Sequence, residues 1–238
     1  MVRVKICGIT HEEDIAICAD AGADALGFVV EYPHPVPWTL TRERAAELMR
    51  GVPPFVSRVA VVGGDASTVL DICAATRPDM VQLHDDEPEK VVKAIATGLL
   101  DTGIRVIKAV RIPAEQDAFD PETPAPPRHF ESAAQRFLEA GAHAILLDTK
   151  TDDRPAGTGR TFEWRIARRV AAAVHPVILA GGLTPRNVSR AIADVRPYGV
   201  DVISSLEDEG HRKLGGRVRA FVRAARDART SSGLSSGG

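Results

Sequence analysis

The stretch EAGAHAILLDT, residues 139–149, contains one complete passage from a helix into a buried strand. Gly141 stands where the helix must end, because glycine adopts the left-handed conformation that closes a helix at little cost. The apolar run that follows reads as a strand. Residues 20–28, DAGADALGF, repeat this arrangement with Gly22 at the helix exit. The repeat indicates a chain built from recurring helix-to-strand units.

Eight apolar runs with strand character recur along the chain, and segments of helical periodicity follow them. The runs are VKICGI (4–9), ALGFVV (25–30), VSRVAVV (56–62), MVQLH (80–84), RVIKAVRI (105–112), AILLDT (144–149), PVILAGG (176–182) and GVDVISS (199–205). Eight strand–helix units predict one α/β domain over residues 1–229, a (β/α)8 TIM barrel, which usually has about 250 residues. A flavodoxin-like open sheet is the alternative, but such a sheet uses about five strands.

The composition is that of an ordinary globular protein, with 44% hydrophobic and 26% charged residues and a net charge of −2. No basic block favours nucleic acid or an anionic membrane as a partner. No apolar run reaches the roughly 20 residues of a membrane helix, and no signal segment is recognised. The three cysteines lack metal-type spacing, so we expect reduced thiols, no metal site and a cytoplasmic location.

Two segments depart from the repeating pattern. Residues 113–130 hold five prolines and read as a surface insertion, either a plain loop or a lid. Residues 230–238, TSSGLSSGG, are small, polar and glycine-rich, and we expect a disordered C-terminal tail. Cys18 and Cys73 fall on helical patterns and are expected to be core residues.

In barrels of this class the active site lies at the carboxyl ends of the strands. Cys7 ends the first predicted strand, His84 the fourth and Asp148 the sixth. A thiol with a lowered pKa can take a proton from carbon, and a protonated carboxyl group can donate one. Strands one and six lie far apart around the ring, so the two groups would face each other across the mouth. The alternative for Cys7 is a small apolar filler.

A phosphate site is predicted at the ends of strands seven and eight. Glycines let backbone amides approach an anion closely, and the pair Thr184–Pro185 is a typical helix start whose amino terminus favours phosphate. The alternative is that these glycines serve only a tight turn. The loop PAGTGR at 155–160 is a further flexible, anion-friendly segment. The candidate phosphate ligands are Gly181, Gly182, Ser204, Ser205, Gly157 and Gly159.

Lys5 and Asp201 lie mid-strand among apolar residues. Closure of the barrel makes the first and eighth strands neighbours, and neither charge should be buried unpaired. We therefore expect an ion pair that lines the barrel floor near Cys7.

Several motifs resemble the phosphoribosylanthranilate isomerase family of tryptophan biosynthesis, in the order that the family shows. They are VKICGIT (4–10), VQLH (81–84), ILLDTKT (145–151), GTGRTFEW (157–164), LAGGLTPRNV (179–188) and GVDV (199–202). The resemblance covers residues 2 to about 226. It implies a (β/α)8 barrel that is a monomer or a homodimer and acts on a small phosphosugar.

The resemblance also implies an Amadori rearrangement that needs no cofactor and no metal. N-(5′-phosphoribosyl)anthranilate becomes 1-(2-carboxyphenylamino)-1-deoxyribulose 5-phosphate. Cys7 matches the family's general base, which abstracts the proton from the second sugar carbon. Asp148 matches the general acid, which must hold a proton near neutral pH and protonates the furanose ring oxygen. His84 belongs to the substrate-binding positions.

The segment PHPVPWTLT, residues 33–41, departs from the family pattern S-P-R-Y-V-S, whose arginine holds the anthranilate end of the substrate. Pro37 stands about where the arginine should be, and Arg42 and Arg44 follow at a helix start. A lost charge-assisted contact is worth roughly 1.5–3 kcal/mol. We expect Trp38 to stack on the aromatic ring.

Two further departures lie on the binding face. Ser205 replaces a glycine in ISSLE (203–207) and is expected to crowd the phosphate loop, and Asp85 in HDD (84–86) adds an acid at the mouth. An alternative function is therefore a divergent relative that uses the same acid–base pair on another phosphorylated sugar or amine. A third is a non-catalytic barrel that binds a phosphorylated ligand. An arginine near Trp38 would favour phosphoribosylanthranilate as the substrate, and a slot without a cation would favour the divergent relative.

Overall fold

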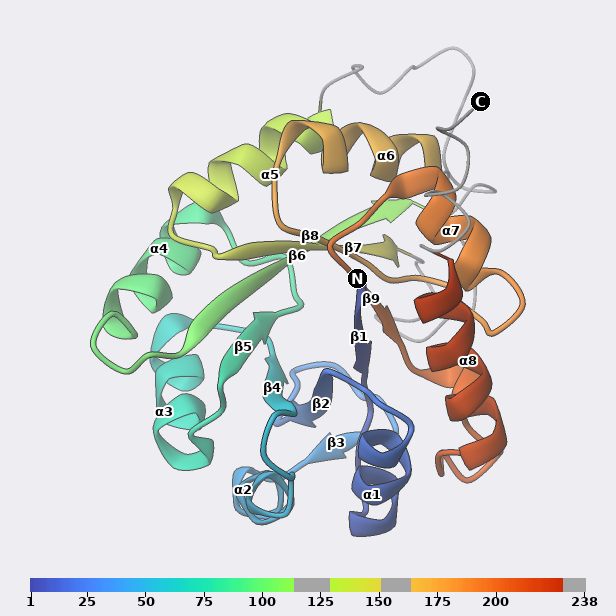
Figure 1. Cartoon of the computed structure of the whole chain (residues 1–238). Coiled ribbons are helices and arrows are strands. Elements are labelled where there is room, and N and C mark those ends of the chain that lie inside the picture. The colour runs from blue at the N-terminus through green and yellow to red at the C-terminus, as the bar shows by residue number, and fades with distance from the viewer. Residues whose placement is uncertain (114–128, 151–163, 229–238) are drawn as a thin grey trace.

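A computed structural model of the chain describes residues 1–113, 129–150 and 164–228. Eight parallel strands form a ring in which β1 pairs with both β2 and β9, so the sheet closes on itself (Figure 1). The strands are β1 (Arg3–Ile6), β2 (Ala25–Val30), β4 (Ser57–Val62), β5 (Met80–Leu83), β6 (Arg105–Pro113), β7 (Ala144–Lys150), β8 (Val177–Leu179) and β9 (Gly199–Val202). The predicted (β/α)8 TIM barrel is confirmed.

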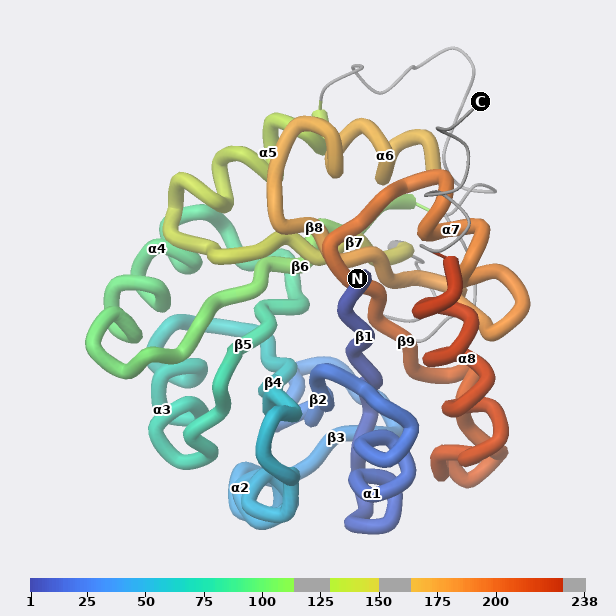
Figure 2. The backbone as a smooth tube through the Cα atoms, viewed as in Figure 1, coloured from blue at the N-terminus to red at the C-terminus, as the bar shows by residue number. Residues whose placement is uncertain are grey.

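The helices surround the strand ring (Figure 2). They are α1 (Glu12–Asp20), α2 (Arg42–Arg50), α3 (Ala66–Thr76), α4 (Glu89–Gly98), α5 (His129–Glu139), α6 (Trp164–Ala173), α7 (Val188–Val195) and α8 (Gly215–Asp227). A short strand, β3 (Thr39–Leu40), adds to β2, and a single 3₁₀ turn, η1 (Ser204–Leu206), follows β9. In the part of the chain that the structure describes, no helix is long and apolar enough to cross a membrane.

The alternation of side chains along each strand divides the core into two layers. On β2 the inner residues Ala25 and Val29 face the barrel axis, whereas Leu26 and Phe28 pack with the helices. Small and branched residues dominate the inner layer, with Val59, Ala109 and Leu146 among them. A strand residue of the inner layer that is polar or reactive is therefore brought toward the axis, and toward the site at the open end.

The helix exits behave as the repeating sequence predicts. Gly22 and Gly141 have φ values of 90° and 105°, in the left-handed region. Arg77 and Arg196 take the same role after α3 and α7, with φ values of 46° and 56°. A side chain in this conformation costs roughly 1–2 kcal/mol, and neither exit carries the glycine that marks such a turn in the sequence.

Helix α7 begins later than the sequence indicates. Thr184 caps a turn, because its Oγ1 accepts hydrogen bonds from the backbone N–H groups of Arg186 and Asn187, each at 3.2 Å. The regular helix starts only at Val188. Of the long insertion predicted at 113–130, residues 114–128 lie outside the described residues, as does the predicted tail at 230–238.

Cys18 and Cys73 are buried in the layer between strands and helices, as predicted. Burial raises the pKa of each of these thiols to about 12. Neither thiol is therefore available as a thiolate near neutral pH.

Candidate active site

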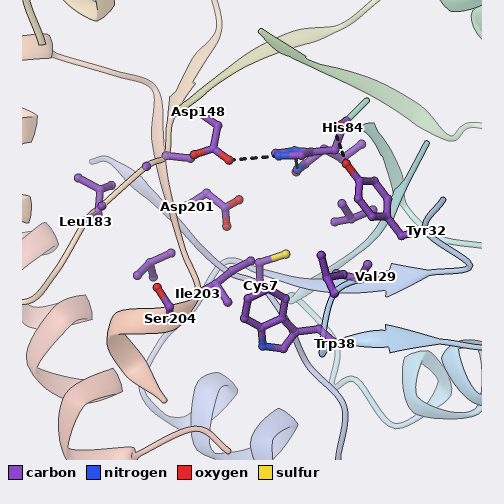
Figure 3. Close-up of a pocket in the computed structure, with 17 residues that line it drawn as sticks. Cys7, Val29, Tyr32, Trp38, His84, Asp148, Leu183, Asp201, Ile203 and Ser204 are labelled. Carbon is purple, nitrogen blue, oxygen red and sulfur yellow. Dashed lines mark hydrogen bonds and ion pairs between the residues drawn. The ribbon is translucent and has the colours of Figure 1, made fainter. Parts of the chain in front are cut away.

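A pocket opens among the carboxyl ends of the strands and encloses about 680 Å³, part of it open to solvent (Figure 3). The residues that line it are Cys7, Val29, Tyr32, Val36, Trp38, Val61, Gln82, His84, Asp148, Ala180, Gly181, Gly182, Leu183, Asp201, Val202, Ile203 and Ser204. The pocket therefore brings together seven of the sequence-predicted site residues, from segments far apart in the chain.

Cys7 follows β1 directly, and its side chain points into the pocket. The residue is 1% exposed. Burial raises the pKa of its thiol, and the ammonium of Lys5 opposes that effect. The position fits a thiol that meets a ligand, but the thiolate needs a compensating charge.

Asp148, on the inner face of β7, lies on the opposite side of the pocket from Cys7 (Figure 3). Its Oδ2 lies 3.1 Å from His84 Nε2, and its Oδ1 accepts a hydrogen bond from the backbone N–H of Thr149 at 2.7 Å. Both oxygens of the carboxyl group are thereby held. Asp148 and Cys7 face the same cavity, as the sequence predicts.

His84 is held from its other ring nitrogen by Gln82, whose Nε2 lies 2.8 Å from His84 Nδ1. In this arrangement His84 donates its Nε2–H to Asp148. Gln82 Oε1 is buried without a hydrogen-bond partner among the described residues. Rotation of this amide would turn Oε1 toward Nδ1–H and leave Nε2 as the acceptor for a protonated Asp148. The Gln82–His84 pair can thus support either protonation state of the carboxyl group.

The glycine pair after β8 takes backbone conformations that other residues rarely adopt, with φ values of 82° for Gly181 and 61° for Gly182. A side-chain carbon on Gly181 would lie 2.9 Å from the backbone nitrogen of Thr149 and 3.1 Å from Asp148 Oδ1. The absence of a side chain therefore lets this loop approach the Asp148 carboxyl group. Both glycines line the pocket.

Ser204 lines the pocket, whereas Ser205 does not. The hydroxyl of Ser205 donates a hydrogen bond to the carbonyl of Leu183 at 2.7 Å. This contact joins the loop after β9 to the loop after β8. The expected crowding of the phosphate loop by Ser205 stays a prediction. Gly157 and Gly159 lie outside the described residues.

Trp38 is buried against the pocket wall by a network that the sequence did not reveal. Its indole N–H donates to both carboxylate oxygens of Glu207, at 3.0 and 3.1 Å. Glu207 also forms an ion pair with Lys213, whose Nζ donates to the backbone carbonyl of Cys7 at 2.6 Å. The indole lies directly over Gly8, where a side-chain carbon would come within 2.8 Å of it. Trp38 is thus fixed at the ligand-facing surface.

The predicted ion pair between Lys5 and Asp201 is present, with 2.7 Å between Nζ and Oδ2. Both side chains are 6% exposed. The pair sits on neighbouring strands in direct register, below Cys7 on the inner face of the barrel. Asp201 also lines the pocket.

The two arginines that follow Trp38 are engaged elsewhere. Arg42 forms a bidentate pair with Glu31, at 2.8 and 2.7 Å, and Arg44 binds Glu12 and Glu47. Asp85 does not line the pocket, and its Oδ1 lies 3.2 Å from His34 Nε2. Among the described residues that line the pocket there is no arginine or lysine, which is the lining expected for the divergent relative, so the pocket lining by itself does not favour phosphoribosylanthranilate as the substrate.

Comparison with known proteins assigns the pattern to one family. The family model described as N-(5′-phosphoribosyl)anthranilate (PRA) isomerase matches residues 4–224. A protein named N-(5′-phosphoribosyl)anthranilate isomerase from Haloferax volcanii is 41% identical over 231 residues, which cover 96% of this chain and 95% of the relative. The protein of the same name from Geobacter sulfurreducens is 42% identical over 227 residues, which cover 95% of this chain and 99% of the relative.

Solved structures agree. The phosphoribosyl anthranilate isomerase from Thermotoga maritima matches with a TM-score of 0.78 and 35% identity, over 95% of this chain and 100% of that one. A phosphoribosyl anthranilate isomerase in complex with reduced 1-(o-carboxyphenylamino)-1-deoxyribulose 5-phosphate matches with a TM-score of 0.75 and 33% identity, over the same shares.

Proposed function

The chain belongs to the N-(5′-phosphoribosyl)anthranilate isomerase family, and from that premise we propose that Cys7 and Asp148 perform its proton transfers. It is an isomerase of tryptophan biosynthesis that converts N-(5′-phosphoribosyl)anthranilate to 1-(2-carboxyphenylamino)-1-deoxyribulose 5-phosphate. The observation that supports the assignment most strongly is the placement of these two side chains on opposite walls of one pocket (Figure 3).

The two groups would act in sequence on one bound substrate. Asp148 donates a proton to the furanose ring oxygen as the bond from that oxygen to the first sugar carbon breaks, and the anilino nitrogen forms an iminium ion with that carbon. The Cys7 thiolate then takes the proton from the second sugar carbon, and the released electron pair neutralises the iminium ion to give an enolamine. Tautomerisation of the enolamine gives the ketose. Asp148 loses one proton and Cys7 gains one.

His84 would hold the Asp148 carboxyl group in place for this donation. Its Nε2 is 3.1 Å from Asp148 Oδ2, and Gln82 fixes the orientation of the ring. Because both His84 and Gln82 are buried, no bulk water competes for these contacts. A protonated Asp148 is compatible with this pair once the Gln82 amide presents its oxygen.

The phosphate would bind on the loops after β8 and β9. Gly181, Gly182 and Ser204 line the pocket there, and Ser205 links the two loops through Leu183. This is the position that (β/α)8 barrels commonly use for phosphate. Gly157 and Gly159 are proposed to contribute from the loop after β7, although they lie outside the described residues.

The anthranilate ring would pack against Trp38. The indole is 4% exposed, and its N–H is held by Glu207, so its face is offered in one fixed orientation. No described arginine or lysine lines the pocket to meet the anthranilate carboxylate. Among the described residues, Trp38 therefore supplies the aromatic contact proposed for this ring.

The enzyme is proposed to be cytoplasmic and a monomer or homodimer. The three cysteines are free and buried, which fits a reducing compartment. A related structure is described as monomers generated from the dimeric Thermotoga maritima enzyme. Sedimentation equilibrium of the purified chain would assign the state.

The catalytic proposal is tested by supplying phosphoribosylanthranilate to the purified protein and following the loss of its fluorescence. The wild type should turn over the compound, and Cys7→Ser should lose most of the rate, because a serine hydroxyl is a far weaker base than a thiolate. Cys18→Ser is the matched control, since Cys18 is a buried thiol outside the pocket. Unchanged activity of Cys7→Ser would end the assignment of Cys7.

A further inference from the structure

Lys5 lies on β1, two residues before Cys7, which directly follows the strand, so both side chains point to the barrel axis. They fill the space over Gly27 of β2. A side-chain carbon placed on Gly27 would lie 3.0 Å from Lys5 Nζ and closer still to the sulfur of Cys7. The ammonium and the thiol therefore pack next to each other, in a space that only a glycine leaves open.

Lys5 also contacts Asp201 of β9, at 2.7 Å from its Oδ2. The other oxygen of this carboxylate, Oδ1, is buried and has no hydrogen-bond partner among the described residues. Figure 3 shows the Asp201 carboxylate in the space between Cys7 and Asp148. The lysine thus stands between the Asp201 carboxyl group, whose pKa burial raises against the opposing effect of Lys5, and a thiol that must ionise to act as a base.

Other charged groups near Cys7 are committed to different contacts. Lys213, from the loop before α8, binds the backbone carbonyl of Cys7 and is paired with Glu207. Across the pocket, His84 and Asp148 bind each other. From β2 the neighbours Gly27 and Val29 carry no charge. Lys5 is the cation whose ammonium shares the packing space of the sulfur.

We propose that Lys5 is a positioning residue for the isomerisation: its ammonium is the counter-cation of the Cys7 thiolate, and Asp201 holds that ammonium in place. The inference rests on the proposed role of Cys7 as the general base. Lys5 keeps its own proton throughout the reaction, while the proton from the sugar carbon ends on the sulfur.

The electrostatics of the buried groups agree with this arrangement. Burial raises the pKa of Cys7, and attraction to Lys5 is the largest effect that lowers it. Burial alone would lower the pKa of Lys5, but Asp201 and then Cys7 raise it above its ordinary value. Lys5 therefore keeps its proton to a higher pH than an ordinary lysine.

The test compares thiol ionisation in two variants that share one background. Asp201→Asn removes the acid and leaves Lys5 to the thiolate alone, and Asp201→Asn with Lys5→Met removes both charges. The double variant leaves no unpaired buried charge at this position, so it is the one expected to fold. Lys108→Met with Glu87→Gln is the matched control, because that buried pair also has 2.7 Å between nitrogen and oxygen but does not line the pocket.

Two readouts are followed against pH. The first is the ultraviolet absorbance of the Cys7 thiolate, with the same variant carrying Cys7→Ser as the blank. The second is the limb of kcat/KM that reports ionisation of the base. Adding Lys5→Met to Asp201→Asn should move the midpoints of both upward together, by about one to three pH units. Asp201→Asn alone should move them downward, and the control should leave them in place.

An unchanged thiolate midpoint on addition of Lys5→Met would overturn the proposal, and so would an equal shift in the control. If the double variant fails to fold, an NMR pH titration of the wild-type protein with ¹⁵N-labelled lysine side chains tests the contact. One lysine Nζ resonance should then shift as Cys7 ionises and stop shifting in Cys7→Ser; no such resonance would refute the contact. The thiolate absorbance does not require turnover. Failure of the proposed role of Lys5 can therefore be distinguished from failure of Cys7 as the catalytic base, which the activity of Cys7→Ser reveals.

Discussion

Two buried lysine–carboxylate pairs lie on opposite faces of the same barrel wall. Lys5–Asp201 lies on the inner face, and Lys108–Glu87 lies on the outer face, each with 2.7 Å between nitrogen and oxygen. The outer ammonium also donates to the carbonyls of Asp85 and Ala109. The inner pair instead leaves one oxygen of Asp201, beside the pocket, without a hydrogen-bond partner in the described part of the chain. The two pairs are thus alike in burial and in distance. They differ at Asp201 Oδ1, the oxygen of the inner pair that has no hydrogen-bond partner among the described residues.

The largest effect expected on the inner face comes from Asp148. Asp148→Asn removes the proton donor and keeps the shape, so kcat should fall by about 10²- to 10⁴-fold while the chain stays folded. Glu87→Gln is the matched carboxyl-to-amide change on the outer side. Steady-state kinetics with both variants decide the point, and comparable losses in the two would erase the distinction between the faces.

The outer pair should show its effect in stability. Lys108→Met leaves Glu87 buried without its partner, so the free energy of unfolding should fall by about 3–5 kcal/mol. The rate constant kcat of the folded enzyme should stay within about twofold, because Lys108 does not line the pocket. Urea denaturation followed by circular dichroism gives the first value. Loss of turnover without loss of stability would contradict the structural role assigned to Lys108.

A smaller effect is expected from His84, which supports Asp148 from the inner wall. His84→Asn should lower kcat about tenfold with little change in KM, since it removes one hydrogen bond to the acid rather than the acid itself. The same substitution at His34, which is 46% exposed in its side chain and pairs with Asp85, is the control. If KM rises instead and kcat is unchanged, His84 binds substrate and does not position Asp148.

The smallest effects are the opposite pH dependences of the two lysines. The pKa of Lys5 is raised above 10.5 by Asp201 and Cys7 against the effect of burial, so its stabilisation is complete below pH 10.5 and is lost as the pH rises through the folded pKa. The pKa of Lys108 is lowered below 10.5, with burial the largest cause, so there the unfolded chain binds more protons and stability rises with pH just below 10.5.

Urea unfolding at a series of alkaline pH values measures these slopes. The variant Lys5→Met with Asp201→Asn should lose the decline above pH 10.5, and Lys108→Met should lose the rise below it. For each unit by which the pKa differs between the folded and the unfolded chain, the free energy of unfolding changes by about 1.4 kcal/mol in total. Slopes of the same sign for the two lysines would contradict the contrast between the pairs.

The sequence predicted those features that depend on strand order and periodicity. Cys7 and Asp148 were predicted to meet because strand ends converge at one rim, and Lys5 was matched to Asp201 because closure makes β1 and β9 neighbours. Lys108 was not matched to Glu87, because Glu87 lies in a loop after β5 that no register determines. The boundary of the barrel at residue 229 remains a prediction.

Side-chain networks were harder to predict from the sequence. The contact of Trp38 with Glu207 joins residues from two loops on different sides of β1, and nothing in their spacing indicates it. Gln82 occupies an ordinary inner strand position, and its effect on His84 depends on a rotamer. The left-handed exits at Arg77 and Arg196 lack the glycine that marks such a turn. Each of these features depends on tertiary packing rather than on local pattern.

The most direct measurement is a crystal structure of this protein with reduced 1-(o-carboxyphenylamino)-1-deoxyribulose 5-phosphate, the compound held by a related isomerase. The Cys7 sulfur should lie about 3–3.5 Å from the second sugar carbon. The Asp148 carboxyl group should contact the oxygen derived from the ring, and the phosphate should lie over Gly181, Gly182 and Ser204. A sugar beyond the reach of either side chain, or a phosphate seated elsewhere, would contradict the account.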